Sequence, residues 1–554
     1  MSCNIAANPT AVVRLCDQLI SELCGETVKD VFHILTSKGQ QPLEGIARIS
    51  RLPLTIVRSA LLILLQHSFV SSQYVQPETT LKGSVAPYFL YSADTAAALH
   101  ILRWPWILHH IAKEYRDSAQ DNDASVLAVN IIQVLLEHGR LRTDQLLSLV
   151  AALCKGDKRK LEGTARTCLA SLVQSRYVQR ARGCEAQRPQ RPLPANVKVR
   201  GAGSKSGTFE KAAQEAHAVR TLAEVTYQDE RFRVPPGLLS TPQGTASVSG
   251  TKRRKIGTDA QPPSAEQEAI LWTVNMEECR VKLRQSLVLE HISSAHGAQA
   301  GALAAALVRA GQKLSGNPAA DESMPATGAD AAAALAKLRS VDPTLPAVKP
   351  DAAAKLLRDL AEDDSCPIHS RGIAGLHDKL FVLNFRQGLD TLRQRHIEAI
   401  VRSRFALVGL RIFRMLQEKK QLEQKQIAEF AMVPVREARE VLYKMLKGGF
   451  LALQDLPRSA DHAANRTIFT WHIDMGAVMR RMATELVQSA GNLRSRMGDE
   501  LRQQAQLMKA MELDATSLSE QETQDGLKLK RVVNVLQIRT LALDSLLALF
   551  EMAD

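Results

Sequence analysis

The sequence predicts a mainly α-helical chain with small β-sheets, because one hydrophobic pattern occurs three times. The copies run from Val28 to Val70, from Val126 to Val178 and from Phe405 to Leu453. In each copy a long helix ends at a turn residue and is followed by a short helix, a third helix and a strand-like run. This order, completed by a strand pair, is typical of the winged helix, a variant of the helix-turn-helix module.

A fourth copy is expected between the second and the last. Helical periodicity returns at Glu266, and a strand-like run ends near Phe385. The stretch from Ser315 to Pro350 is Ala- and Pro-rich and is interpreted as a loose insertion. The region is therefore predicted to be a winged helix with an insertion.

The last eighty or so residues have continuous helical periodicity, which predicts an antiparallel helical hairpin or coiled coil. One Met- and Leu-rich stripe extends from Met479 to Met511, and a second extends from Leu529 to Phe550. The predicted fold is thus four tandem winged helices with small β wings and a C-terminal hairpin. The predicted domains are 1–100 and 101–181 (winged helices one and two), 182–264 (linker), 265–395 and 396–473 (winged helices three and four) and 474–554 (hairpin).

The predicted linker carries much of the positive charge. The formal net charge of the 554-residue chain is +13, and residues 181–264 contain 14 Lys and Arg against 7 Asp and Glu. Frequent Pro, Gly and Ser predict that this segment is disordered. The run Lys252, Arg253, Arg254 and Lys255 is either a solvated charge run or a nuclear import signal.

Several function classes find no support in the sequence. No run approaches the roughly 18 apolar residues of a membrane span, so no membrane association is expected. The eight cysteines form no Cys-x-x-Cys pair, and Gly201–Gly207 lacks the spacing of a phosphate-binding loop. We expect no metal, no cofactor and no catalytic site.

The third helix of each copy indicates what that copy binds, because a helix that reads DNA needs an exposed basic or polar face. From Pro53 to His67 the only charged side chain is Arg58, so this helix is predicted to be buried and its module to dock on protein. The second and fourth copies are predicted to contact the DNA backbone. The candidate residues are Lys155, Lys158, Arg159, Lys160 and Arg166, and Arg436, Arg439, Lys444, Lys447, Arg458 and Arg466.

These modules and some local stretches resemble a known family. The strongest matches are residues 423–446 and 456–474, with further matches at residues 23–43, 64–70, 103–107 and 177–180. The chain resembles the winged-helix subunit of DNA-directed RNA polymerase III, which is the third-largest subunit and belongs to the heterotrimer specific to that polymerase. That family is related to the alpha chain of general transcription factor IIE.

The resemblance implies a non-catalytic nuclear subunit that joins two smaller subunits and docks on the clamp of the largest polymerase subunit. It also implies a role with initiation factors in promoter opening and in initiation on transfer RNA and 5S ribosomal RNA genes, with contacts to melted, single-stranded DNA. Two alternatives are a free-standing transcription factor that binds a specific duplex site and a helical scaffold of the signalosome or proteasome-lid class. The diluted basic faces argue against the first, and the position of the winged helices argues against the second.

Overall fold

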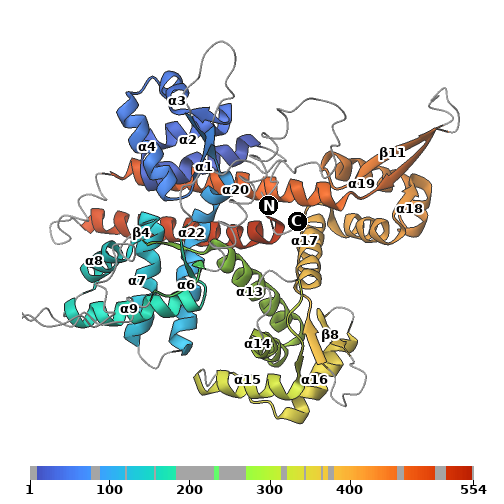
Figure 1. Cartoon of the computed structure of the whole chain (residues 1–554). Helices are drawn as coiled ribbons and strands as arrows, with labels where there is room; N and C mark the ends of the chain where they lie inside the picture. The colour runs from blue at the N-terminus through green and yellow to red at the C-terminus, as the bar shows by residue number, and fades with distance from the viewer. Residues whose placement is uncertain are drawn as a thin grey trace, which may run out of the picture. The chain divides into compact units, whose positions relative to one another are not determined.

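The computed structural model is mainly helical and contains four small sheets (Figure 1). It describes residues 9–75, 88–118, 122–154, 158–181, 230–235, 270–312, 321–341, 345–363, 366–371, 380–457, 467–505 and 520–551. The predicted class, helical with small sheets, is confirmed. The count of four winged helices and the coiled coil stay predictions.

The chain forms two compact units, residues 16–279 and residues 280–554 together with 1–15. Each unit holds two of the sheets, and every sheet is antiparallel and three-stranded. In all four sheets the last strand in sequence lies in the centre, between a short first strand and the middle strand. We call the sheets with their helices the first to fourth modules.

The first module is built on helices whose apolar residues recur every three or four positions. Its elements are the part of α1 (Pro9–Cys24) from Cys16 onward, α2 (Glu26–Lys38), β1 (Gln41–Pro42), α3 (Leu43–Ser50), α4 (Leu54–Gln66), β2 (Val70–Val75), β3 (Tyr88–Ala93) and α5 (Thr95–Leu99). Val28, Val31 and Leu35 of α2 are buried on one side of the helix. Asp94 caps α5 by accepting hydrogen bonds from the backbone N–H groups of Ala96 and Ala97.

The second module contains a strand that the sequence did not predict. Its elements are a short 3-10 helix (His100–Arg103), α6 (Trp104–Ser118), α7 (Asn122–His138), β4 (Leu141–Arg142), α8 (Thr143–Leu153), α9 (Lys158–Gln174), β5 (Val178–Arg180) and β6 (Leu271–Val274). Residues 271–274 were expected to be helical, but they form the central strand between β4 and β5. The expectation was wrong because a short half-buried strand next to a long helix blends into the helical periodicity. The second module therefore extends beyond the predicted limit at residue 181.

A short part of the predicted linker is ordered on this module. Residues 230–235 lie beside β5, where the backbone N–H of Arg180 donates to the Arg231 carbonyl at 3.0 Å. The Arg231 guanidinium donates to Asn275 and Glu277 at 3.2 and 2.7 Å and lies over the ring of Phe232. The prediction of disorder is wrong for these residues; the rest of the linker, including Lys252–Lys255, lies outside the described residues.

The first two modules share a polar junction between two turns. In the turn after α7, the backbone N–H of Arg140 donates a hydrogen bond to the Gln66 carbonyl at 3.2 Å. In return, Gln66 Nε2 donates a hydrogen bond to the His138 carbonyl at 2.7 Å. Gly139 adopts φ +75°, and a Cβ there would lie 2.5 Å from the Gln66 oxygen. The close approach of the two backbones therefore requires glycine at this position.

The third module is more regular than the sequence predicted. It comprises α13 (Met276–His296), α14 (Ala298–Gln312), β7 (Ala326–Thr327), α15 (Gly328–Val341), α16 (Pro350–Glu362), β8 (Ile368–Arg371) and β9 (Leu380–Leu383). Helix α15 lies inside the stretch interpreted as a loose insertion. Its buried residues include Ala331, Ala332 and Leu335. Since two of the three are alanines, the helix has little hydrophobic contrast and was missed.

The fourth module follows a long, sharply bent helix. Its elements are α17 (Phe385–Lys419), β10 (Gln421–Glu423), α18 (Gln424–Phe430), α19 (Val435–Lys447), β11 (Ala452–Pro457) and β12 (Thr467–His472). Ala406 interrupts α17 with φ 57° and ψ −164°. The first half of α17 packs in the core of the third module through Phe385 and Leu389, and the second half buries Phe413 and Leu416.

The chain ends in two long helices that pack on each other, α20 (Met475–Gln503) and α22 (Glu520–Glu551). Among the described residues one helix, spanning residues 521–551, is long and apolar enough to cross a membrane. The expectation that no such segment exists is therefore wrong by length and composition. Core helices meet the same test, and Leu547, Leu549 and Phe550 are buried within the protein.

Candidate nucleic-acid interface

Helix α19 presents a surface with several exposed basic residues. Its apolar residues Ala438, Leu442 and Met445 are buried, so the opposite side faces solvent. The basic residues Arg436, Arg439, Lys444 and Lys447 are not buried, as the sequence predicts for candidate DNA contacts. Among the described residues neither Arg436 nor Arg439 lies within ion-pair distance of a carboxylate, but the Arg436 charge still acts on Glu440 and helps to lower its pKa.

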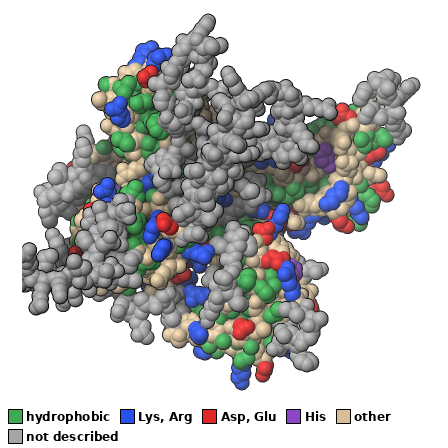
Figure 2. Space-filling view, in the orientation of Figure 1, with side chains coloured by type: hydrophobic (Ala, Val, Ile, Leu, Met, Phe, Trp, Pro, Cys, Tyr) green, Lys and Arg blue, Asp and Glu red, His purple; other side chains and the backbone are tan. Residues whose placement is uncertain are grey.

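Acidic side chains reduce the charge of this surface. Lys444 Nζ donates to Glu440 Oε1 at 2.7 Å, and this hydrogen bond with the Lys444 charge lowers the pKa of the Glu440 carboxyl. Glu437 is exposed on the first turn of the helix. Figure 2 shows the same mixture of Lys and Arg with Asp and Glu over this part of the molecule. The arrangement suits contacts with a phosphate backbone better than reading of base edges.

An aromatic group connects α19 to the wing strands. The ring of Tyr443 meets that of Trp471 on β12 edge to face, with centroids 5.4 Å apart. Phe469, two residues before Trp471 on β12, lies on the same face of the strand and is 44% exposed. Tyr443 itself is 53% exposed. Exposed rings beside arginines are a surface on which unpaired bases stack.

The turn before α19 exposes apolar side chains that were not predicted from the sequence as part of a site. Phe430, Met432 and Val435 are all exposed, and Met432 is 88% exposed with φ +53°. Their signal in the sequence is the run Phe430–Pro434, which has too many apolar residues for a solvated turn. This apolar tip adjoins the basic face and is a second surface available for contact.

The candidates of the second module are less well defined. Lys158, Arg159 and Lys160 form the first turn of α9, where free backbone N–H groups favour anions. Arg166 is half-buried and bonds to Glu162 at 3.3 Å, which leaves it poorly placed for phosphate. Lys155, Arg458 and Arg466 lie outside the described residues, so their part in the predicted set stays a prediction.

Helix α4 of the first module differs from its prediction. Val57, Ala60, Leu61 and Leu64 are buried, but Leu54, Ile56, Leu62 and Ile63 are exposed, with Leu62 at 61%. The helix was predicted to be buried on all sides; it is instead buried on one side and apolar on the other. Figure 2 shows hydrophobic and basic side chains together over α3 and α4. An exposed apolar helix face is typical of a surface that binds another protein.

Among the residues that the structure describes, no cluster is placed to hold a metal ion, and two buried thiols have raised pKa values. No group of three or more His, Cys, Asp or Glu side chains is placed to hold a metal ion there. Burial raises the pKa of the Cys168 thiol to about 11 and that of the Cys279 thiol to about 12. These thiols stay protonated near neutral pH, and a protonated thiol is a poor nucleophile.

Comparison with known families gives two matches in the regions just described. The family described as the POLR3C C-terminal winged-helix domain matches residues 397–473, which contain α18, α19 and the fourth sheet. The family described as the RNA polymerase III subunit RPC82 helix-turn-helix domain matches residues 14–76 of the first module.

Full-length comparison extends the similarity over nearly the whole chain. DNA-directed RNA polymerase III subunit RPC3 of Homo sapiens is 25% identical over 518 residues, which cover 93% of this chain and 89% of the relative. RPC3 of Danio rerio is 24% identical over 92% of this chain and 88% of the relative. The predicted family resemblance is confirmed. RPC3 of Dictyostelium discoideum is 31% identical over a shorter stretch, 30% of this chain and 25% of the relative.

Proposed function

We propose that this chain is a non-catalytic subunit of DNA-directed RNA polymerase III and acts in the nucleus. It joins two smaller subunits, docks this heterotrimer on the clamp of the largest subunit and works with initiation factors. The similarity to RPC3 over 93% of the chain is the observation that carries this proposal. The two matched helix-turn-helix regions support it, because they lie in different halves of the chain and belong to the same subunit family.

The surfaces of the modules suggest that different modules bind different partners. The exposed apolar residues of α4, such as Leu54 and Leu62, suit docking on protein. The basic and aromatic surface of α19 suits sequence-tolerant contact with DNA, because it combines exposed arginines with Tyr443 and Phe469. We propose that the fourth module, with the basic first turn of α9, holds melted DNA during promoter opening and initiation on transfer RNA and 5S ribosomal RNA genes.

The alternative, a free-standing factor that reads a specific duplex site, is less well supported. A recognition helix needs several side chains free to bond base edges. On α19, Lys444 is engaged by Glu440, and Glu437 repels phosphate near the start of the helix. These two carboxylates reduce the positive charge available for reading base edges, so α19 suits sequence-tolerant contact with the phosphate backbone better.

Affinity purification of the tagged full-length chain from nuclear extract tests the proposal, with subunits identified by mass spectrometry. Recovery of RNA polymerase III with two small partner subunits is expected. A Leu54→Ser/Leu62→Ser variant should lose part of this assembly, and a Val126→Ser/Leu153→Ser variant, also changed at exposed apolar positions, is the matched control. Recovery of the chain alone, or with an assembly other than a polymerase, would overturn the proposal.

A further inference from the structure

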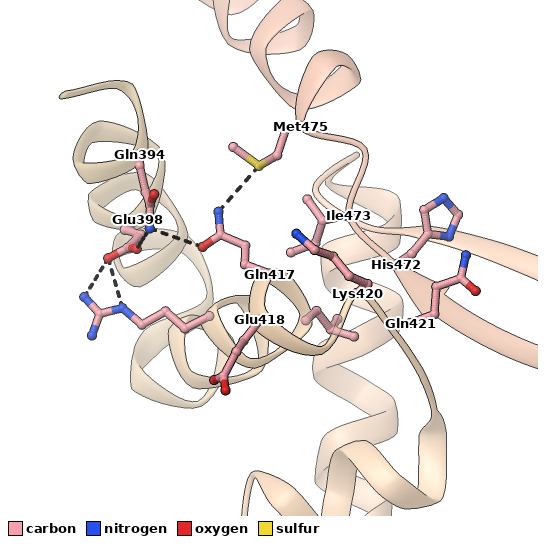
Figure 3. Close-up of a pocket in the computed structure, with 11 residues that line it drawn as sticks. Gln394, Glu398, Gln417, Glu418, Lys420, Gln421, His472, Ile473 and Met475 are labelled. Atoms are coloured by element: carbon pink, nitrogen blue, oxygen red, sulfur yellow. Dashed lines mark hydrogen bonds and ion pairs between the residues drawn. The ribbon is translucent and has the colours of Figure 1, made fainter. Parts of the chain in front are cut away.

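The segment α17 consists of two helices joined across a kink at Ala406, and the second helix folds back on the first. Arg414 donates from Nε and Nη2 to Glu398 Oε2 at 3.0 and 2.6 Å, although the two residues are 16 positions apart. In a straight helix this spacing corresponds to about 24 Å along the axis. Gln394 also donates to Gln417 at 3.4 Å across 23 positions. The two halves of α17 therefore lie against each other, as Figure 3 shows.

The reversal takes place at one strained residue. Ala406 has φ 57° and ψ −164°, a combination that is almost confined to glycine. Such a conformation persists in a residue with a side chain only where the surrounding contacts enforce it. Ala406 is itself exposed, so the contacts that enforce it belong to its neighbours.

Phe405 provides the first of these contacts. Its ring meets that of the buried Phe450 edge to face, with centroids 5.4 Å apart. A Cβ at Gly409 would overlap the Phe405 side chain, and a Cβ at Gly448 would lie 2.9 Å from its ring. Phe405 therefore occupies a slot that exists because two glycines lack side chains.

A charged cluster holds Arg404, the residue before Phe405, in place. Arg404 bonds both carboxylate oxygens of Glu485 on α20, at 2.6 and 3.3 Å, and its guanidinium lies over the Phe450 ring. Arg481 donates to the same carboxylate at 3.1 Å. Burial alone would raise the pKa of the Glu485 carboxyl, but the hydrogen bonds and charges of the two arginines together lower it. The pair is thus held in its charged form.

The two halves of α17 also line an open pocket of mixed polar and apolar character. Gln394 and Glu398 line it from the first half of α17, and Arg414 and Gln417 line it from the second (Figure 3). His472 and Met475 close it from the end of the fourth module. Its volume of about 810 Å³ depends on both halves, so straightening of α17 would abolish the pocket.

From these contacts we infer that Ala406 is the pivot of a two-state hinge between the third and fourth modules. In the state seen here Phe405 fills its slot and Glu398 pairs with Arg414. In the second state the helix continues through Ala406, the strain is relieved, and the fourth module swings away from the third. The first half of α17 stays in the third module, because Phe385 and Leu389 are part of its core and Arg393 Nε bonds the Leu549 carbonyl at 2.9 Å.

The hinge is tested by distance measurement between spin labels on the full chain. Labelled unnatural amino acids replace Lys355 on α16 and Lys425 on α18, neither of which is buried. The unsubstituted hinge should give a main short distance and a minor longer one. Ala406→Gly removes most of the backbone strain and should lower the ratio of the long-distance population to the short-distance population by roughly tenfold. Ala406→Val should raise this ratio by a similar factor.

A second pair of variants separates the hinge from loss of folding. Gly448→Ala obstructs the Phe405 slot and should also favour the longer distance. Gly163→Ala, at a helical glycine with open space around its Cβ position, should leave the distances unchanged. One short distance that neither Ala406→Val nor Gly448→Ala alters, in chains that remain folded, would overturn the hinge. This result would not affect the polymerase assignment, which purification tests separately.

Discussion

The indole Nε1 of Trp272 donates a hydrogen bond to Thr143 Oγ1 at 2.9 Å, across 129 positions of the sequence. Trp272 lies on β6, the central strand of the second sheet, and is fully buried. The core of the second module is therefore completed by a residue that follows the whole basic segment.

Trp272→Ala should destabilise the second module by about 3–5 kcal/mol, because it leaves a large cavity and removes the partner of Thr143. Urea unfolding followed by circular dichroism measures the change. Leu271→Ala, one position earlier but exposed, is the matched control and should cost less than about 1 kcal/mol. Equal losses for the two variants would contradict the placement of β6.

Gly139→Ala should weaken the junction of the first two modules. A left-handed conformation costs an alanine about 1–2 kcal/mol, and the overlap with the Gln66 carbonyl adds about 1–3 kcal/mol. Gly39→Ala is a control for backbone strain alone, since Gly39 has φ +78° and ψ −157°, a combination almost confined to glycine, and no atom within 4 Å of the added Cβ. Limited proteolysis should show faster cleavage at the junction in the Gly139→Ala variant. Cleavage there that is no faster than in the Gly39→Ala variant would show that the junction contributes nothing.

The same junction should weaken in acid. Burial, with a smaller contribution from His138, lowers the pKa of His67 to about 4. The unfolded chain then binds the proton more tightly than the folded chain, so stability is complete above about pH 6.5 and declines as the pH falls towards about 4. After discount for partial exposure, we expect a loss of about 1–2 kcal/mol between about pH 7.5 and about pH 5.

Urea unfolding at these two pH values measures the loss, and His67→Gln removes the titrating group. Between these two pH values, the free energy of unfolding should fall by about 1–2 kcal/mol less in the variant than in the unsubstituted chain. If the two chains respond identically to pH, the buried neutral form of His67 is not the cause.

Arg436→Ala/Arg439→Ala should weaken binding of single-stranded DNA and reduce its dependence on salt. Each lost phosphate contact should lower the slope of log K against log salt by about 0.7. Fluorescence anisotropy with an oligonucleotide of mixed sequence measures both effects. Lys528→Ala/Lys530→Ala on α22 is the control with the same change of charge, and an equal reduction there would exclude a specific role of α19.

Lys158→Ala/Arg159→Ala/Lys160→Ala tests the second module in the same assay. These residues form the first turn of α9, so their removal should reduce the salt slope by about 2 if all three contact phosphate. An unchanged slope would remove α9 from the proposed DNA path. The two sets of variants together decide whether one module or both hold the nucleic acid.

Periodicity predicted most helices of the modules because residues such as Val28, Val31 and Leu442 recur at helical spacing and are buried. It failed where the decisive contact is distant in sequence. Leu271–Val274 resembles the start of α13 until β4 and β5 provide its partners. The kink at Ala406 has no local signal either, because it is imposed by Gly448, Phe450 and Glu485, which are far along the chain.

The pattern of charged residues predicted only part of the candidate site. Arg436 and Arg439 are exposed as a basic face requires, because the apolar residues of α19 define the opposite side. Charge alone did not indicate the exposed Phe469 and Met432, and it did not show that Arg166 is engaged by Glu162. For α4, a run of apolar residues indicated burial, but a small module has too little interior to cover every side of the helix.

The position of β6 also has a consequence during synthesis on the ribosome. The helices of the second module and β5 emerge first, but the centre of their sheet is translated about 90 residues later. At roughly 5–20 residues per second, this interval lasts roughly 5–20 s. Until Trp272 leaves the exit tunnel, the nascent module exposes the core that this side chain later covers, so it is a substrate for chaperones for that time.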